Sequence, residues 1–134
     1  MNQVLRPEPK PSPESLPFWE GCKQSKLLLP RCSQCGLHWF PPSSYCPECW
    51  SKEWNWEQSH GLGSLHSFVI FKRQYHPSFE PPYAVGVVQL EEGVRILAHL
   101  ICEDLTLLSV NTPMILSWEQ AGAWLIPAFT PKLD

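Results

Sequence analysis

Residues 30–50 read PRCSQCGLHWFPPSSYCPECW and contain four of the six cysteines as two Cys-x-x-Cys pairs with ten residues between them. A Cys-x-x-Cys turn brings two sulfurs close together, and two such turns complete the tetrahedron of ligands that zinc prefers. Gly36, directly after the first pair, can supply the positive φ that such a turn commonly requires. The spacing predicts a rubredoxin-like zinc ribbon with one zinc ion on four ligands: Cys32, Cys35, Cys46 and Cys49.

The predicted zinc is structural, because a shell of four thiolates leaves no open coordination position for water or substrate. Two alternatives stay open: a redox dithiol, which would need only one pair, and metal ligation by His38, three residues after Cys35. The two remaining cysteines are candidates for a nucleophile, but a free cysteine is usually a small buried hydrophobe. Cys102 ends an apolar run and is expected to be such a buried residue, and for neither Cys22 nor Cys102 does the sequence indicate a Cys/His/Asp constellation.

The composition bounds the class of protein. The chain has 134 residues, of which 43% are hydrophobic and 17% charged, and a formal net charge of -3. These values suit a soluble globular protein with one ordinary domain or two small ones. The sequence has no apolar run long enough to span a bilayer and no apolar signal-peptide run, so we expect a cytoplasmic protein without a membrane partner. Cytosolic thiols stay reduced, which favours metal binding over disulfides.

Prolines dominate the start of the chain, where they occupy every second position: Pro7, Pro9, Pro11 and Pro13. Because they remove backbone donors, residues 1–16 are expected to form a disordered tail. Residues 17–28 are expected to hold a short helix and its lead-in, with proline tolerated in the first turn. The helix is too short to be stable alone, so Phe18 and Trp19 are predicted to dock on the chain itself or on a partner subunit.

Residues 59–134 have the pattern of short strands. Runs rich in β-branched and aromatic residues are separated by turn residues, at 63–73, 83–90, 93–102, 114–120 and 123–129. The break at Glu91–Gly93 predicts a hairpin between the second and third runs. Five strands in about 70 residues fit an OB-type Greek-key barrel better than a seven-stranded sandwich. The predicted fold is mainly β, with an N-terminal short helix, a zinc ribbon at 29–58 and a five-stranded OB-fold barrel at 59–134.

A ribbon followed by an OB barrel also permits single-stranded nucleic-acid binding, which is the alternative function. Tryptophans near the ribbon, at positions 39, 50, 54 and 56, are candidates for a base-stacking platform. We expect them instead to fill contacts between ribbon, helix and barrel, because the ribbon has few other large apolar side chains. From residue 60 onward, four basic residues stand against seven acidic ones, which is a poor balance for following a phosphate backbone. We therefore expect no nucleic-acid partner.

Residues 17–50, PFWEGCKQSKLLLPRCSQCGLHWFPPSSYCPECW, and the barrel stretch YHPSFEPPYAVGVVQLEEGVRILAHL resemble a known family. It comprises the zinc-ribbon plus OB-fold acyl-CoA-associated proteins, long catalogued as a domain of unknown function. The resemblance covers roughly residues 16–130. Members of this family are mostly accessory subunits of thiolase-type or hydratase-type enzymes that act on coenzyme A thioesters. Some pair with sterol-carrier-protein-type thiolases that cleave steroid side-chain CoA esters by a retro-aldol reaction.

The resemblance implies a non-catalytic accessory subunit that binds a thiolase-type partner, forms a hetero-oligomer with it, and helps to bind or channel an acyl-CoA thioester. The process implied is steroid side-chain or lipid degradation. The family has no agreed catalytic residue to transfer, so none is assigned, and the reaction chemistry would belong to the partner. An autonomous enzyme is the remaining alternative.

The residues expected to touch acyl-CoA lie in FKRQYHPSFEPPYA, residues 71–84, the longest polar connection of the predicted barrel. Lys72 and Arg73 would offset phosphate charge, and Tyr75 and Phe79 would cover the pantetheine or acyl portion. His76 would donate a hydrogen bond or relay a proton to the partner's site. The alternative is a stiff hairpin loop set by its prolines, with both cations merely solvated.

Overall fold

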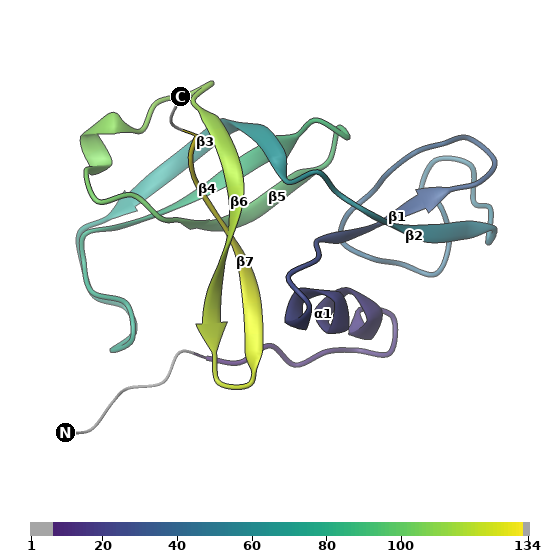
Figure 1. Ribbon diagram of the computed structural model, residues 1–134, viewed down its shortest axis with the longest axis horizontal. Coiled ribbons are helices and arrows are strands. Elements are labelled where there is room, and N and C mark those ends of the chain that lie inside the picture. The colour runs from purple at the N-terminus through teal and green to yellow at the C-terminus, as the bar shows by residue number, and fades with distance from the viewer. Residues whose placement is uncertain (1–6, 133–134) are drawn as a thin grey trace.

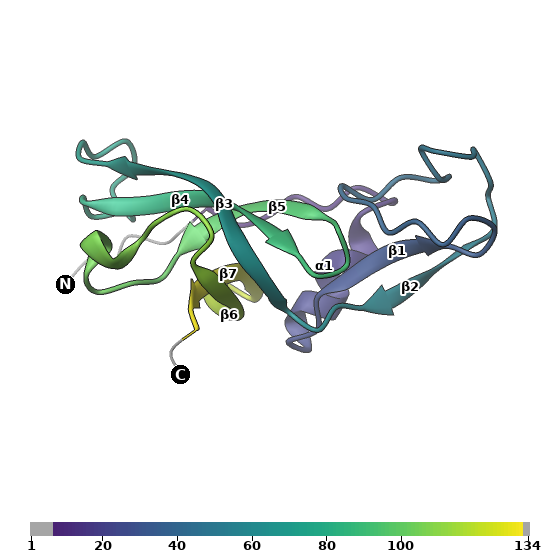
Figure 2. The same cartoon turned by 90° about the horizontal axis from the view of Figure 1, so that it is seen from above.

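The structure, a computed structural model, describes residues 7–132 as two lobes with a short helix packed against both. Figure 1 shows a barrel on one side, a small two-stranded ribbon on the other, and α1 below and between them. Seen from above in Figure 2, the two lobes lie along the long axis of the molecule. The elements are α1 (Leu16–Lys23), β1 (Leu28–Cys32), β2 (Trp54–Gln58), β3 (Leu62–Phe71), β4 (Tyr83–Leu90), β5 (Arg95–Leu100), the 3-10 helix η1 (Leu105–Leu107), β6 (Pro113–Ala121) and β7 (Trp124–Pro131).

The barrel has the strand order of an OB fold. Its five strands close in the order β3-β4-β5-β7-β6, with β5 and β7 parallel and the other neighbours antiparallel. The predicted OB-fold barrel is confirmed, and so is the predicted hairpin, because β4 and β5 pair on either side of Glu91–Gly93. Burial alternates along β4 and β5, as expected for strands with one face in a core.

One difference concerns the segment after β5, which was predicted as strand up to residue 102. The strand ends at Leu100, and η1 follows. Asp104 begins this 3-10 turn, because its carboxylate accepts hydrogen bonds from the backbone N–H of Thr106 at 3.0 Å and from the Thr106 hydroxyl at 2.6 Å. A local side-chain cap therefore competes with the β ladder here.

The helix α1 packs on the chain's own core. Phe18 is only 3% exposed and Cys22 is fully buried, and both belong to one apolar cluster that includes Leu27, Leu29 and the interior of the barrel. This corrects the expectation that Phe18 is available to a partner: the helix is too short to be stable without burying that ring. None of the helices within residues 7–132 is long and apolar enough to cross a bilayer.

In Figure 1, residues 7–15 cross the β6–β7 hairpin above its turn and then run below α1. A Glu8 carboxylate oxygen accepts a hydrogen bond from the backbone N–H of Ala123 at 3.2 Å, and a Glu14 carboxylate oxygen accepts one from the Ser44 hydroxyl at 3.0 Å. These contacts differ from the expectation of a disordered tail over residues 1–16, because two carboxylates find donors on the folded body. Residues 1–6 of that expected tail lie outside the described residues.

A carboxylate in the β4–β5 turn fixes the connection between ribbon and barrel. Glu92 accepts hydrogen bonds from the hydroxyl of buried Ser59 at 3.0 Å and from the backbone N–H of His60 at 2.9 Å. The Ser59 hydroxyl in turn accepts from the backbone N–H of Gly61 at 3.0 Å. The linker after β2 is thus held by three hydrogen bonds as it enters the barrel.

Candidate functional site

The four ribbon cysteines converge at the end of β1. Their sulfurs all lie within 4.8 Å of one another, with Cys32 and Cys49 at 3.5 Å and Cys35 and Cys46 at 3.6 Å. A regular tetrahedron of zinc–sulfur bonds of about 2.3 Å has edges of about 3.8 Å. The donor set therefore fits one zinc ion, and the predicted structural zinc on the ribbon is confirmed. The shell is complete with thiolates, so the ion would organise the fold and take no part in a reaction.

Backbone N–H groups support the sulfurs. Those of Cys35 and Gln34 point at the Cys32 sulfur, at 3.5 and 3.4 Å, and lower the pKa of that thiol to about 6. Glu48 N–H points in the same way at the Cys46 sulfur, at 3.4 Å. Such donors favour the thiolate form, which is the form that binds metal.

Of the other ribbon residues, some side chains pack in the core and others lie at the surface. His38 does not join the cysteine cluster, because its Nε2 lies 3.1 Å from a Glu57 carboxylate oxygen instead. Three of the four tryptophans fill contacts as expected: Trp39 packs on Cys32 and Cys46, Trp54 packs beside them, and Trp56 packs on the main core. Trp50 does not, since 69% of it is exposed.

Of the two cysteines outside the ribbon, Cys22 is fully buried, and burial raises the pKa of its thiol to about 12. Cys102, which was expected to be buried, is only half-buried, and its sulfur lies 3.1 Å from the carbonyl oxygen of Asp104. A protonated thiol at Cys22 excludes a nucleophilic role for it near neutral pH.

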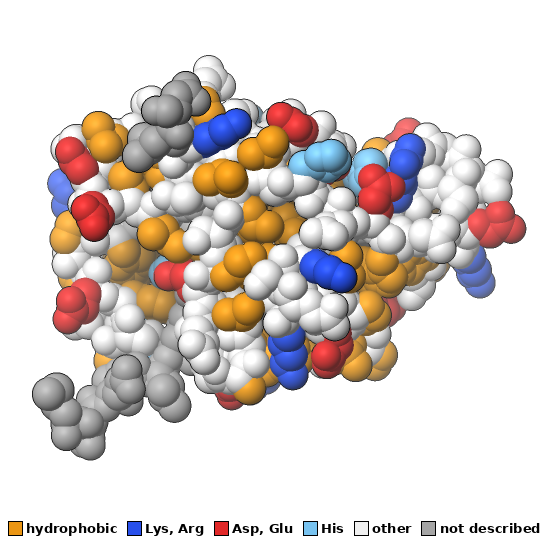
Figure 3. Space-filling view, viewed as in Figure 1, with side chains coloured by type: hydrophobic (Ala, Val, Ile, Leu, Met, Phe, Trp, Pro, Cys, Tyr) orange, Lys and Arg blue, Asp and Glu red, His pale blue; other side chains and the backbone are white. Residues whose placement is uncertain are grey.

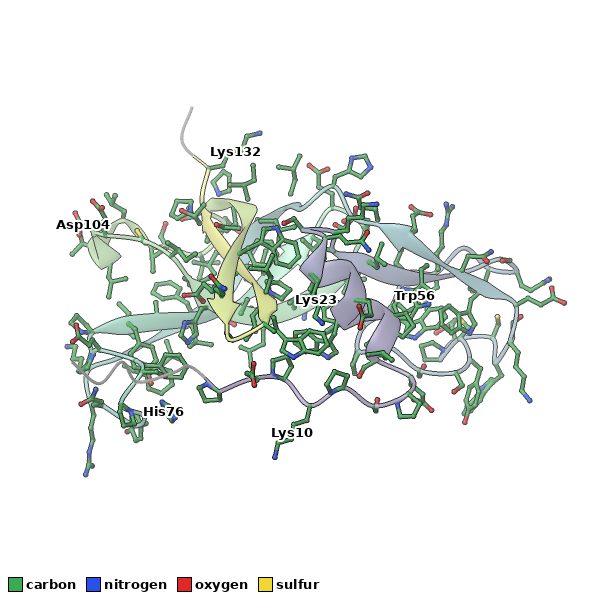
Figure 4. All side chains as sticks on the ribbon, turned by 60° about the horizontal axis from the view of Figure 1, so that its bottom comes forward. Lys10, Lys23, Trp56, His76, Asp104 and Lys132 are labelled. Atoms are coloured by element: carbon green, nitrogen blue, oxygen red, sulfur yellow. The ribbon has the colours of Figure 1, made fainter. Side chains whose placement is uncertain are left out.

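A second group of side chains gathers at the end of the barrel away from the ribbon. The loop between β3 and β4 carries His76, which Figure 4 shows on the opposite side of α1 from Trp56 of the ribbon. The Phe79 ring lies 5.5 Å from the His76 ring, 5.7 Å from the Tyr83 ring and 4.8 Å from the His99 ring, between centroids. Tyr83 begins β4 and His99 lies on β5, so loop and strands form one aromatic cluster.

The two histidines of this cluster present different ring nitrogens. The Nδ1 atom of His76 accepts a hydrogen bond from the backbone N–H of Ser78 at 3.1 Å, so its neutral ring carries the proton on Nε2. The Nδ1 atom of His99 lies 3.3 Å from a Glu119 carboxylate oxygen, which can only accept, so this nitrogen carries the proton. His76 therefore has an Nε2 donor and neutral His99 an Nε2 acceptor, and both rings pack on Phe79.

Of the remaining loop residues that were singled out from the sequence, Tyr75 reaches this cluster only through Phe71, whose ring stacks on Tyr83 at 5.0 Å. Tyr75 is 68% exposed and contacts Phe71 edge-on at 5.7 Å. Lys72 and Arg73 are exposed where the loop leaves β3, and neither forms an ion pair with any residue in the range 7–132. Trp19 is half-buried and packs edge-on against Phe18 and Trp124, which favours a structural role for it.

Both lobes match described families. Residues 19–55 match the family described as "ChsH2, rubredoxin-like zinc ribbon domain", and residues 56–119 match "ChsH2, C-terminal OB-fold domain". A solved structure titled "Ltp2-ChsH2(DUF35) aldolase" superposes with a TM-score of 0.86 at 30% identity, over 92% of this chain and 98% of that one. The chain belongs to the DUF35 family. The two matches agree with the zinc ribbon and the OB fold that the sequence predicted.

Curated relatives of this DUF35 chain carry three kinds of name. A probable enoyl-CoA hydratase alpha subunit from Thermomonospora curvata is 32% identical over 98% of this chain and 41% of its own length. A DUF35 domain-containing scaffold protein from Methanothermobacter thermautotrophicus is 36% identical over 66% of this chain and 68% of its own. The benzoylsuccinyl-CoA thiolase subunit BbsA from Thauera aromatica is 36% identical over 61% of each. The chain spans about two fifths of the hydratase relative's length.

Sequence reasoning missed two members of the aromatic cluster, Tyr83 and His99, and the carboxylate of Glu119 that lies beside His99. The signal for His99 was its position in β5, where it follows Arg95 and Leu97 on the outward-facing side of an alternating strand. The signal for Glu119 was weaker, because acidic residues are common on strand surfaces. Nothing in the sequence indicates that these two side chains meet, since their strands are not hydrogen-bonded to each other and β7 lies between them.

Surface charge bears on the nucleic-acid alternative. On the face of the described chain shown in Figure 3, Lys and Arg side chains are spread singly among acidic and apolar ones. A groove that follows a nucleic-acid backbone needs cations along its length. This face of the DUF35 chain therefore does not favour that alternative.

Proposed function

We propose that this chain is a non-catalytic accessory subunit that binds a thiolase-type acyl-CoA enzyme and contributes its β3–β4 loop and β4–β5 face to the acyl-CoA site. The observation that carries the proposal is the match over 92% of this chain to a structure whose title pairs a DUF35 chain with Ltp2 in an aldolase. The names of the relatives, a hydratase subunit, a thiolase subunit and a scaffold protein, support an acyl-CoA enzyme complex. The steroid or lipid nature of the acyl group stays a prediction.

The aromatic cluster supports the ligand part of the proposal. OB folds bind extended ligands on the face of their second and third strands and on the loop between the first and second. Those elements are β4, β5 and the β3–β4 loop of this chain. Phe79 and Tyr83 offer an apolar wall, and His76 offers an Nε2 donor suited to a carbonyl oxygen. Lys72 and Arg73, both exposed, are suited to the phosphates of coenzyme A.

Reconstitution tests the proposal. The chain is co-expressed with the products of the genes beside its own, and any complex that it forms with an acyl-CoA enzyme subunit is characterised by size exclusion and native mass spectrometry. We expect a stable hetero-oligomer, no turnover by this chain alone, and turnover of acyl-CoA by the complex. Failure of the purified subunits to associate would refute the accessory role, and turnover by this chain alone would refute its non-catalytic character.

The ligand site is tested separately in the assembled complex. We expect the double variant Lys72→Ala/Arg73→Ala to raise KM for acyl-CoA at least about fivefold, and His76→Ala to lower kcat/KM by a similar factor. Lys132→Ala is the matched control, because Lys132 is also exposed and Figure 4 shows it far from His76. Values within about twofold of wild type for both loop variants, with assembly intact, would show that the loop is only scaffold.

A further inference from the structure

Trp50 follows the second Cys-x-x-Cys turn at the position that Gly36 occupies after the first turn. Each Cys-x-x-Cys turn is followed by one residue with positive φ: Gly36 at 79° and Trp50 at 63°. The N–H groups of these residues close equivalent turns, donating to the carbonyl oxygens of Cys32 at 3.0 Å and Cys46 at 2.9 Å. A left-handed backbone conformation costs energy for a bulky L residue but not for glycine. The Trp50 backbone is therefore strained, and glycine could form the same turn without that strain.

The Trp50 side chain contributes little packing to the fold that could offset this backbone strain. All seven tryptophans lie in the described part of the chain. Six of them are buried or half-buried, and Trp50 is 69% exposed. Its ring stacks on Tyr45, itself 41% exposed, with centroids 5.4 Å apart and planes at 30°. Strain that packing does not explain is characteristic of functional positions.

The stacked pair is held on a rigid base. The Trp39 indole N–H donates to the Ser43 hydroxyl at 3.0 Å, and the Ser43 hydroxyl donates to the carbonyl oxygen of Tyr45 at 3.0 Å. The Trp54 indole N–H donates to the carbonyl oxygen of Ser44 at 2.9 Å. Two tryptophans packed at the metal site thus fix the loop that presents Tyr45. A preorganised aromatic pair loses little conformational entropy on binding.

Charge around the pair selects the kind of partner. Two exposed carboxylates lie beside the pair: Glu14 accepts a hydrogen bond from the Ser44 hydroxyl next to Tyr45, and Glu48 stands two residues before Trp50. Glu53 instead accepts from the Gln34 side chain at 2.6 Å, at the first cysteine turn, and Lys52 is the exposed ammonium group nearby in the chain. This acidic rim repels the phosphates of a nucleic acid, for which stacked aromatics would otherwise be suited. It complements a protein surface in which basic side chains surround an apolar pocket.

We propose that Tyr45 and Trp50 anchor the ribbon end of this chain in a basic-rimmed apolar pocket of its partner enzyme subunit. The inference rests on the proposed accessory function and assigns that function a docking surface. Buried Trp and Tyr side chains are the residues in which interface binding energy concentrates. The ribbon end and the β3–β4 loop lie at opposite ends of the long axis, so docking and ligand contact are separable (Figures 1 and 4).

The test measures, by biolayer interferometry, the binding of the purified, zinc-loaded chain to the purified acyl-CoA enzyme subunit that co-expression identifies as its partner. We expect Trp50→Gly to raise Kd by about tenfold or more, while the free chain keeps one zinc and melts at the wild-type temperature or above, because the strain is relieved. Tyr45→Ala, which leaves the positive-φ residue untouched, should also raise Kd. Leu107→Ser is the control, because Leu107 is 60% exposed on the barrel, and its Kd should stay at the wild-type value.

The outcomes separate this inference from the proposed function. Absence of wild-type binding refutes the accessory role itself, whereas wild-type binding with unchanged Kd in both aromatic variants overturns only the docking surface. Acrylamide quenching gives a second readout: the difference between wild type and Trp50→Gly should disappear in the complex if Trp50 is buried there. Binding of a short oligothymidylate by wild type but not by Trp50→Gly would overturn the proposal in favour of nucleic-acid stacking.

Discussion

Replacing Glu92 with alanine tests whether the β4–β5 turn fixes the ribbon on the barrel. The change removes the acceptor for the buried Ser59 hydroxyl and for the backbone N–H of His60. A hydrogen bond to a charged group contributes about 1.5–3 kcal/mol, but the exposed His60 amide regains a bond to water. We therefore expect a loss of about 2 kcal/mol in the free energy of unfolding, mostly from Ser59. For a chain of this length that corresponds to a melting temperature lower by roughly 8 °C.

The assay is thermal and guanidinium unfolding of the zinc-loaded chain, followed by circular dichroism. Glu91→Ala is the matched control, because this neighbour has the same charge and is exposed. Glu92→Gln keeps one carbonyl acceptor and should lose about half as much stability as Glu92→Ala. If Glu92→Ala melts no lower than Glu91→Ala, the carboxylate does not hold the linker and the reasoning from these two hydrogen bonds is refuted.

Three further changes have defined outcomes. Cys46→Ser should abolish zinc binding and unfold the ribbon, since coordination contributes on the order of 10 kcal/mol; metal analysis that still finds one zinc would contradict this. Gly63→Ala should destabilise the barrel by about 3 kcal/mol or more, measured by denaturant unfolding, because a Cβ there would overlap the backbone oxygen of Gln89. Hydrogen bonds from Thr106 lower the pKa of Asp104 below 3.8, so its carboxylate stabilises the fold above that pH. The stability difference between wild type and Asp104→Asn should therefore shrink as the pH falls below about 4, and a constant difference would argue against the cap.

Local patterns were sufficient for the parts of this protein that depend on short-range geometry. The metal centre follows from two Cys-x-x-Cys turns, because each turn sets its own pair of sulfurs with few backbone angles. The β4–β5 hairpin follows from a turn at Glu91–Gly93 between two alternating strands, where chain neighbours pair directly. The end of β5 was harder to predict, since the Asp104 cap and the β ladder compete for the backbone groups that follow Leu100.

Only part of the candidate ligand site could be predicted from the sequence. His76 and Phe79 share one loop, so their proximity could be expected from a single stretch of chain. His99 and Glu119 come from β5 and β6, and they meet because β7 lies between these strands and pairs with each. Such a contact depends on barrel closure and register, which no local pattern encodes.

The four-cysteine zinc ribbon and the five short strands after it could be predicted from the amino-acid pattern, because ligand spacing and strand periodicity are properties of neighbouring residues. Which aromatic side chains lie in the core and which on the surface depends on the packing of the folded chain. Phe18 and Trp50 have similar apolar character, yet one is 3% and the other 69% exposed. That difference arises from packing between elements distant in the chain, since α1 buries Phe18 against the barrel, whereas Trp50 stacks on Tyr45, which is itself 41% exposed.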